Sequence, residues 1–230
     1  LMLPVIQKLQ SLPSMLLTVV VTGGHFDSSM QDSLKDIKET VSAPLHFIPI
    51  TSENKCSRDI CNQVSSVITK FSEWLESNQS EMILVLGDRH EMLGICTAAL
   101  IHRVPIAHIH GGDISEGAID ELVRHSITKM AMYHFPASEL SKRRILQMGE
   151  ISNCVSNSGS LGVENALNSC NMGSIPVEKP YALLTYHPET SICPDNINWQ
   201  QNQHHFGSYS LRFQWRKYQN KWKKKPEVPG

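Results

Sequence analysis

The stretch MILVLGDRHEMLGICTAALIHRVPIAHIHGGD, from Met82 to Asp113, decides the fold. It opens and closes with short apolar runs that contain β-branched residues, and a longer helical pattern lies between them. These runs predict strands over 82–86 and 104–109, joined by a helix over 91–101. A strand, a helix and a second strand in this order indicate a parallel sheet, because parallel strands need a long crossover connection.

The same alternation continues on both sides of this stretch. Two more apolar runs, LLTVVV at 16–21 and LHFIPI at 45–50, predict strands. Several of the runs are continuously apolar, which is typical of strands that helices cover on both faces. We therefore expect an α/β fold with a parallel sheet and further helices over 28–38, 58–76, 119–132 and 138–148. Ser138 offers a cap for the last helix, and Gly149 offers its stop.

The composition describes a globular protein that stays in water. Of its 230 residues, 40% are hydrophobic and 19% are charged, and the formal net charge is -1. These values exclude a disordered chain, collagen and a coiled coil. No apolar run approaches the ~20 residues that span a bilayer, so we expect no membrane partner. The start lacks the basic region of a secretory signal, and the six cysteines form no CxxC pair. We expect reduced thiols and a cytoplasmic protein.

The alternation of strands and helices stops after residue 150. Residues 152–160 and 165–174 are rich in Ser, Asn and Gly, and YALLTY at 181–186 predicts a new strand. We interpret this region as a crossover between domains. The chain then has three parts: a first domain at 1–150, the crossover and the start of a second domain at 151–190, and a divergent tail at 191–230.

The tail differs from the rest of the chain in charge. It carries seven Lys and Arg residues against Asp195 and Glu227, whereas residues 1–190 carry 14 basic and 20 acidic residues. Aromatic and basic side chains of this kind can stack on bases and contact phosphates. Because no sustained apolar face accompanies them, we interpret the tail as solvated and disordered, and we expect no nucleic-acid partner.

Polar residues follow three of the predicted strands, at the edge where an open α/β sheet binds its ligands. In LVLGDRHE, 84–91, Gly87 permits a tight exit from the strand and leaves Asp88 and Arg89 at the carboxyl edge of the sheet. An acid at this place can act on a proton or a hydroxyl of a substrate. The alternative is that Asp88 only caps the following helix.

The densest polar cluster is AHIHGGDISEGAIDELVRH, 107–125. Its paired glycines, Gly111 and Gly112, let backbone amides approach a ligand closely. On the expected helix, a spacing of four residues predicts two ion pairs, Asp120 with Arg124 and Glu121 with His125. A solvated helix face with weak ion pairs is the alternative. The place of the cluster, directly after an apolar strand, favours a functional site.

Two further features involve histidines. His187, in LLTYHPET at 183–190, follows the strand expected in the second domain, and both a structural and a catalytic role stay open for it. A metal site is the other feature, and it would combine His108, His110, Asp113 and Asp88. The sequence blocks of metallophosphoesterases match this chain poorly, so we expect no metal.

The residues from 84 to 149, among them GDRHE, HIHGGD and IDELVRHSITKM, closely resemble the hydrolysing UDP-N-acetylglucosamine 2-epimerases of sialic acid and related nonulosonic acid synthesis. The resemblance covers most of residues 1–190, including NSGSLGVENAL and LLTYHPET. Members of that family are similar to GT-B glycosyltransferases, which hold their substrate between two Rossmann-like domains. The resemblance therefore implies a Rossmann-like parallel sheet in a GT-B type N-terminal domain, followed by a fragment of the second domain.

The resemblance also implies a reaction. A base takes the C2 proton of the sugar, UDP leaves to give a glycal-like intermediate, and water adds to release an N-acetylmannosamine-type sugar. This chemistry needs an acid/base pair at the sugar and cations around the diphosphate. It implies no metal and no other cofactor. The implied partner is a UDP-sugar substrate, and a homo-oligomer stays open.

Residue roles carry over position by position. The resemblance implies acid/base work for three carboxylates: Asp88, Asp120 and Glu121. His187 is implied to contact the UDP phosphates or to protonate the leaving group. Substrate binding is implied for six further residues: Arg89, His110, Gly111, Gly112, Arg124 and His125.

The sequence departs from the family pattern at both ends. The family begins with a strand and a Gly-Thr-Arg type loop, whereas this chain opens with what resembles the following helix, and the resemblance stops near Thr190. We therefore expect a truncated chain whose first domain lacks its first strand. The leading function is a hydrolysing epimerase of UDP-N-acetylglucosamine or of UDP-N,N'-diacetylbacillosamine. An inactive fragment of such an enzyme is the alternative, and the clustered carboxylates disfavour a GT-B sugar transferase.

Overall fold

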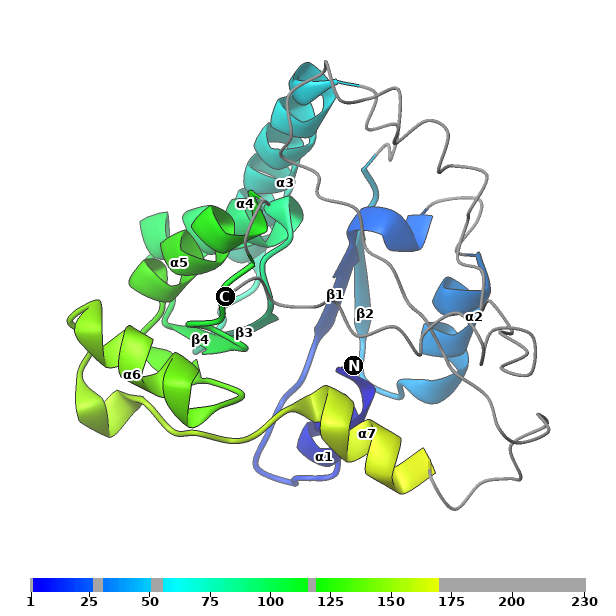
Figure 1. The fold of residues 1–230 in the computed structure, drawn as a ribbon. Coiled ribbons are helices and arrows are strands. Elements are labelled where there is room, and N and C mark those ends of the chain that lie inside the picture. The colour runs from blue at the N-terminus through cyan, green and yellow to red at the C-terminus, as the bar shows by residue number, and fades with distance from the viewer. Residues whose placement is uncertain (1, 27–30, 51–55, 116–118, 170–230) are drawn as a thin grey trace, which may run out of the picture. The chain divides into compact units, whose positions relative to one another are not determined.

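Parallel strands joined by helices organise the chain (Figure 1). The computed structural model of the protein describes residues 2–26, 31–50, 56–115 and 119–169. These residues belong to one unit, Leu1–Ser169. The strand expected at 181–186, His187 and the tail at 191–230 lie outside the described residues.

The described strands form two parallel ladders. In the first, β1 (Val19–Thr22) pairs with β2 (Leu45–Ile48). In the second, the strand order is β3 (Ile83–Leu86), β4 (Ile106–Ile109) and β5 (Tyr133–Phe135). The α/β fold and the parallel pairing are confirmed, but the expected single sheet is present as two ladders among these residues.

Helices connect and cover the strands, and four of the five predicted ones agree with the structure to within two residues at each end. The described α-helices are α1 (Leu3–Gln10), α2 (Gln31–Thr40), α3 (Ser57–Ser77), α4 (His90–Ile101), α5 (Asp120–Met130), α6 (Glu139–Gln147) and α7 (Leu161–Ser169). Two 3-10 turns, η1 (Gly23–Phe26) and η3 (Ser152–Cys154), complete the described elements. Helix α7 lies within the segment that the sequence predicted to be a crossover. No helix in these described ranges is long and apolar enough to cross a membrane.

Local chemistry sets the ends of these elements. Strand β2 stops at Ile48 because Pro49 follows it and has no N–H for the ladder. Strand β4 begins at Ile106 instead of Val104, because the Val104 amide bonds to the Ala99 carbonyl at the end of α4. The predicted limits of α6 are confirmed: the Ser138 hydroxyl accepts the Ser141 amide, and Gly149 adopts a φ of 89°.

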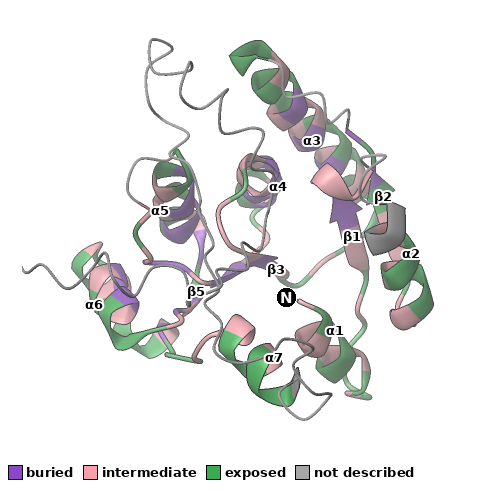
Figure 2. Cartoon of the chain, turned by 45° about the vertical axis from the view of Figure 1, so that its right-hand side comes forward, coloured by how far each residue is buried: buried purple, intermediate pink, exposed green. Residues whose placement is uncertain are grey.

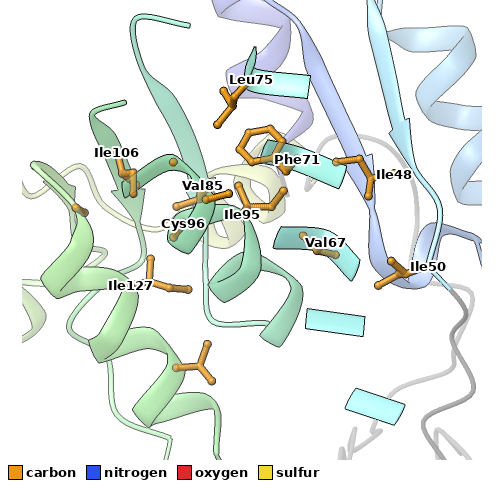
Figure 3. Packing of buried hydrophobic residues seen from close by; sticks show 14 residues of the cluster. Ile48, Ile50, Val67, Phe71, Leu75, Val85, Ile95, Cys96, Ile106 and Ile127 are labelled. Atoms are coloured by element: carbon orange, nitrogen blue, oxygen red, sulfur yellow. The ribbon is translucent and has the colours of Figure 1, made fainter. Parts of the chain in front are cut away.

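A single apolar cluster joins the two ladders (Figure 3). Phe71 and Val67 of α3 lie between Ile48 of β2 and Ile95 of α4, and all four are buried. Helices α3 and α4 approach closely, since a methyl group at Gly94 would lie 3.0 Å from Val67 Cγ1. Each such side chain contributes about 1.5 to 3 kcal/mol when it is buried. Figure 2 shows buried residues on the strands and on α3 to α5, whereas α1 carries none.

Candidate active site

The candidate site lies at the carboxyl ends of β3 and β4, which are neighbours in register. The exit of β3 brings Asp88 and Arg89 to this edge, and the exit of β4 brings His110 and Asp113. Gly87 allows the first exit because its φ is 81°, while its amide still bonds to the Ile109 carbonyl at 3.0 Å. The sequence predicts that these two segments lie at the same edge of the sheet, and the structure confirms that they are adjacent.

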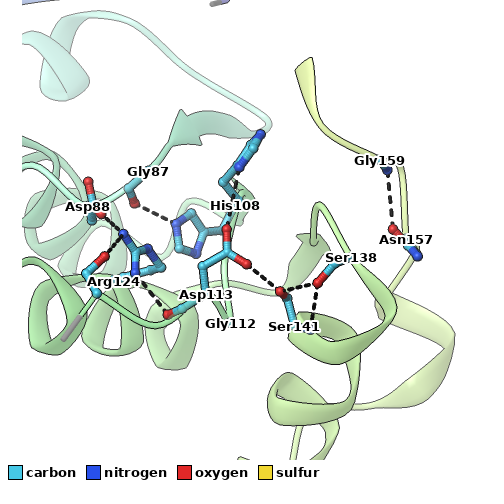
Figure 4. A network of polar contacts seen from close by, with 12 residues as sticks. Gly87, Asp88, His108, Gly112, Asp113, Arg124, Ser138, Ser141, Asn157 and Gly159 are labelled. Carbon is cyan, nitrogen blue, oxygen red and sulfur yellow. Dashed lines mark hydrogen bonds and ion pairs between the residues drawn. The ribbon is translucent and has the colours of Figure 1, made fainter. Parts of the chain in front are cut away.

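Asp88 and Arg124 form an ion pair at this edge (Figure 4). The Asp88 side chain is 23% exposed and the Arg124 side chain 8%. The same guanidinium donates to the Asp113 carbonyl at 2.9 Å and to Ser115 Oγ at 3.0 Å. Asp88 does not cap α4, because the N-cap of that helix is Arg89 and no side chain caps it. One buried cation therefore holds together the exits of β3 and β4.

The predicted pair between Asp120 and Arg124 is wrong. Asp120 is exposed and has no ion-pair partner among the described residues, because acceptors at the strand exits surround the Arg124 guanidinium instead. The second predicted pair is present, with His125 Nε2 3.9 Å from Glu121 Oε1. Glu121 also accepts the Ser115 amide at 3.2 Å. Of the two adjacent acids, only Glu121 joins the network within the described residues.

Behind the ion pair lies a buried histidine, His108 of β4. Its Nε2 donates to the Gly87 carbonyl at 2.8 Å, so the proton is on Nε2, since a carbonyl only accepts. Burial lowers the pKa of His108 to about 4, which keeps the ring neutral at pH 7. Thr128 Oγ1 lies 3.2 Å from Nδ1 and donates to the Arg124 carbonyl at 2.9 Å. His108 and Thr128 thus connect the turn that carries Asp88 to the helix that carries Arg124.

The glycine pair after β4 fits closely against its surroundings. A methyl group at Gly111 would lie 2.9 Å from His108 Nδ1, and one at Gly112 would overlap the Ser141 carbonyl oxygen. Gly112 has a φ of 80°, and its own carbonyl accepts from Arg144 of α6 at 3.1 Å. Packing alone therefore requires glycine at both positions, and their amide contacts to a ligand stay a prediction.

Two of the predicted site histidines have a buried ring nitrogen without a hydrogen-bond partner in the described part of the chain. His110 has a φ of 62°, an uncommon backbone conformation for a residue other than glycine, and its Nδ1 lies 3.6 Å from Asp113 Oδ2. His110 Nε2 and His125 Nδ1 are buried and have no hydrogen-bond partner in the described part of the chain. Buried polar atoms are almost always bonded, so these two nitrogens are exceptions, and their contact to a substrate stays a prediction. Asp113 itself accepts from the Ser141 hydroxyl.

Sequence reasoning missed two residues that support the site. Thr128 gave no signal beyond its place in a helix. Glu91 looked like an ordinary acid in a first helical turn, but it is buried and bonded to Arg89 at 2.8 and 3.1 Å. No group of three metal-ligating residues is arranged to hold an ion within the described ranges.

Comparisons with known proteins show which family the sequence matches. The family model described as UDP-N-acetylglucosamine 2-epimerase matches residues 7–201. Polysialic acid biosynthesis protein P7 of Escherichia coli is 32% identical over 84% of this chain and 51% of its own length. The GDP/UDP-N,N'-diacetylbacillosamine 2-epimerase (hydrolyzing) of Campylobacter jejuni is 33% identical over 80% of this chain and 50% of its own length.

The fold is shared with a solved structure. The structure resembles the crystal structure of UDP-GlcNAc 2-epimerase from Neisseria meningitidis bound to UDP-GlcNAc, with a TM-score of 0.62 and 23% identity. That match covers 74% of this chain and 46% of the other. The chain thus spans about half the length of the relatives it matches.

Proposed function

This chain belongs to the UDP-N-acetylglucosamine 2-epimerase family, and we propose that it carries the N-terminal part of the active site of a hydrolysing 2-epimerase. Its α/β fold with Rossmann-like parallel strands is that of the GT-B type enzymes of this family. The proposed reaction converts a UDP-sugar and water into UDP and a free N-acetylmannosamine-type sugar for nonulosonic acid synthesis. The observation that carries the proposal is the Asp88–Arg124 pair at the carboxyl edge of β3 and β4.

The first step of the proposed reaction is removal of the C2 proton. Asp88 is the base that we assign to it, because the adjacent buried guanidinium favours the ionised carboxylate, which accepts a proton. As the C2–H bond breaks, a C1–C2 double bond forms and the C1–O bond to UDP breaks. The electron pair of that bond leaves with the β-phosphate oxygen.

The second step adds water to the glycal-like intermediate. The hydroxyl joins C1, and a proton joins C2 from the opposite face, which inverts that carbon. We assign this proton to the neighbouring acids Asp120 and Glu121 at the start of α5. Glu121 is the better anchored of the two, through the Ser115 amide and His125. The orphaned nitrogens of His110 and His125 support sugar binding beside these acids.

Departure of the diphosphate requires positive charge. Among the described residues, we assign this positive charge to Arg89, because its side chain is 61% exposed at the exit of β3. His187, which lies outside the described residues, is proposed to contact the same diphosphate or to protonate it as it leaves. We also infer a cytoplasmic location, which the four free thiols in the described residues support.

The Campylobacter relative favours a second sugar. Its name refers to an N,N'-diacetylbacillosamine nucleotide, so UDP-N,N'-diacetylbacillosamine is the alternative substrate to UDP-N-acetylglucosamine. An inactive fragment is the alternative to activity, since the chain spans half of its relatives' length.

One experiment separates these proposals. The purified chain and a version extended to the length of its relatives are incubated with each of the two nucleotide sugars, and UDP release is followed. Release with one sugar identifies the substrate. UDP release by the extended version alone supports the inactive-fragment alternative. If neither version releases UDP from either sugar, the proposed function is contradicted.

A further inference from the structure

A buried carboxylate, Glu91, lies next to the candidate site without belonging to its predicted residues. It is in the first turn of α4, and its side chain is only 3% exposed. Both of its oxygens accept from one guanidinium: Arg89 Nη2 lies 2.8 Å from Oε1, and Arg89 Nε lies 3.1 Å from Oε2. This forked geometry fixes the plane of the guanidinium, which a single bond would not.

The same carboxylate contacts the exit turn of β1. Gly23 begins η1 with a φ of 75°, and a methyl group there would lie 2.7 Å from Glu91 Oε1. Strands β1 and β3 belong to different ladders and share no backbone hydrogen bonds. The Glu91 side chain, which follows β3 in the chain, therefore connects the carboxyl end of β3 to the turn after β1.

Neighbouring contacts hold this arrangement in place. His90 Nε2 lies 3.7 Å from Glu91 Oε1, and the His90 ring also bonds to Gln63 of α3 at 2.9 Å. Burial by itself would raise the pKa of Glu91, but the hydrogen bonds and the charge of Arg89 outweigh it and lower that pKa. The carboxylate is thus ionised at neutral pH, as the fork requires.

We propose that Glu91, which packs against the exit of β1, is a positioning residue that holds the Arg89 guanidinium at the exit of β3, oriented to bind the diphosphate of a nucleotide sugar. This inference rests on the proposed function. A side chain that is already fixed in the free protein loses less conformational entropy when the ligand binds. Glu91 acts through Arg89 and does not touch the reacting atoms.

The test is a double-mutant cycle on UDP affinity, measured in the version of the chain that is extended to the length of its relatives. Glu91→Gln keeps the shape of the side chain but removes one acceptor and the charge, so we expect UDP to bind about tenfold more weakly. Arg89→Ala should weaken binding at least as much. Because Glu91 acts through Arg89, Glu91→Gln should add no further loss in the Arg89→Ala background. The proposal would be overturned if the loss of UDP affinity in the double variant were the product of the losses in the two single variants. It would also be overturned if Glu91→Gln bound UDP as tightly as the wild type.

Controls separate positioning from folding. Glu139→Gln, a change at an exposed acid in the first turn of α6, should leave UDP affinity unchanged. Glu91→Asp keeps the charge but shortens the side chain by one methylene, so it should also weaken UDP binding. If Glu91→Gln does not fold, this variant decides the cycle.

The Arg89 Nε–H resonance in the NMR spectrum gives a readout that needs no variant. In the wild-type chain this proton should exchange slowly with water and should shift when UDP is added. Fast exchange in the wild type contradicts positioning by Glu91. A wild-type chain that binds no UDP even when extended to the length of its relatives contradicts the proposed function itself, whereas wild-type binding that survives Glu91→Gln contradicts only the role of Glu91.

Discussion

Asp88 and Arg124 form an ion pair although they are 36 residues apart in the sequence. The pair connects the exit of β3 to α5, and Arg124 extends it to the exit of β4 through the Asp113 carbonyl. His108 and Thr128 connect the same segments from behind. The geometry of the proposed base is thus set by contacts across three elements.

Asp88→Asn tests the assignment of the base. The amide keeps the size of the side chain but does not take up the C2 proton, so UDP release should fall at least ~100-fold. UDP affinity should stay within about threefold of the wild type, because the base does not bind the nucleotide.

Asp36→Asn is the matched control, since Asp36 is exposed on α2 and far from the site in sequence. Its turnover should equal that of the wild type. A loss of UDP affinity in Asp88→Asn as large as its loss of turnover would assign Asp88 to binding instead of proton transfer.

Arg124→Lys tests whether the cation organises the strand exits. A lysine ammonium lacks the planar fork and does not reach the Asp88 carboxylate, the Asp113 carbonyl and Ser115 Oγ together. The free energy of unfolding should therefore fall by about 1 to 3 kcal/mol, measured by urea denaturation. Arg143→Lys, at an exposed position of α6, should change it by less than ~0.5 kcal/mol. Equal free energies of unfolding in the two variants would show that Arg124 does not hold the exits of β3 and β4 together.

The buried His108 predicts a pH dependence of stability. Its folded-state pKa of about 4 lies below the ordinary value of 6.5. Between these values the unfolded ring binds a proton that the folded ring does not, so the free energy of unfolding falls as the pH drops from 6.5 to 4. Two and a half pKa units correspond to about 3 kcal/mol.

His108→Gln isolates this contribution, because a glutamine amide can still donate to the Gly87 carbonyl but does not titrate. The variant should be less stable than the wild type at pH 7.5, and the difference should shrink toward pH 4. Burial also lowers the pKa of His134, and that residue is present in both proteins. Parallel stability curves would contradict the assignment.

Gly112→Ala and Gly149→Ala separate steric overlap from backbone strain. Both glycines have left-handed φ angles, 80° and 89°, but no atom lies within 4 Å of a methyl group at Gly149. Gly149→Ala should therefore cost only the backbone term of about 1 kcal/mol. Gly112→Ala should cost about 1 to 3 kcal/mol more in a denaturation experiment, because its methyl group overlaps the Ser141 carbonyl. Equal costs would mean that the turn after β4 adjusts freely.

The sequence predicted β3, α4 and β4 well because periodicity and chain order are local signals. Errors at the strand ends came from backbone groups bonded elsewhere, such as the Val104 amide at the end of α4. Strand β5 was missed because it has only three residues and one buried side chain, His134. Four apolar runs also do not reveal whether they form one ladder or two.

The site was predicted in part for the same physical reason. Asp88, His110 and Glu121 follow strands or begin a helix, and chain order places them at one edge. The partner of Arg124 depends on which acceptors surround it in space, so the spacing of four to Asp120 was misleading. Glu91 was missed because burial of an acid leaves no trace in a sequence.

The most direct test of the proposed chemistry is the fate of the C2 hydrogen. The chain, extended to the length of its relatives, is given the nucleotide sugar in D2O, and the free sugar is analysed by NMR and mass spectrometry. We expect the free sugar to carry one deuterium at C2 and the inverted configuration at that carbon. Asp88→Asn should form no such labelled, inverted sugar. UDP release that leaves the original hydrogen on C2 would contradict proton removal by Asp88 and the assignment of this site as a 2-epimerase.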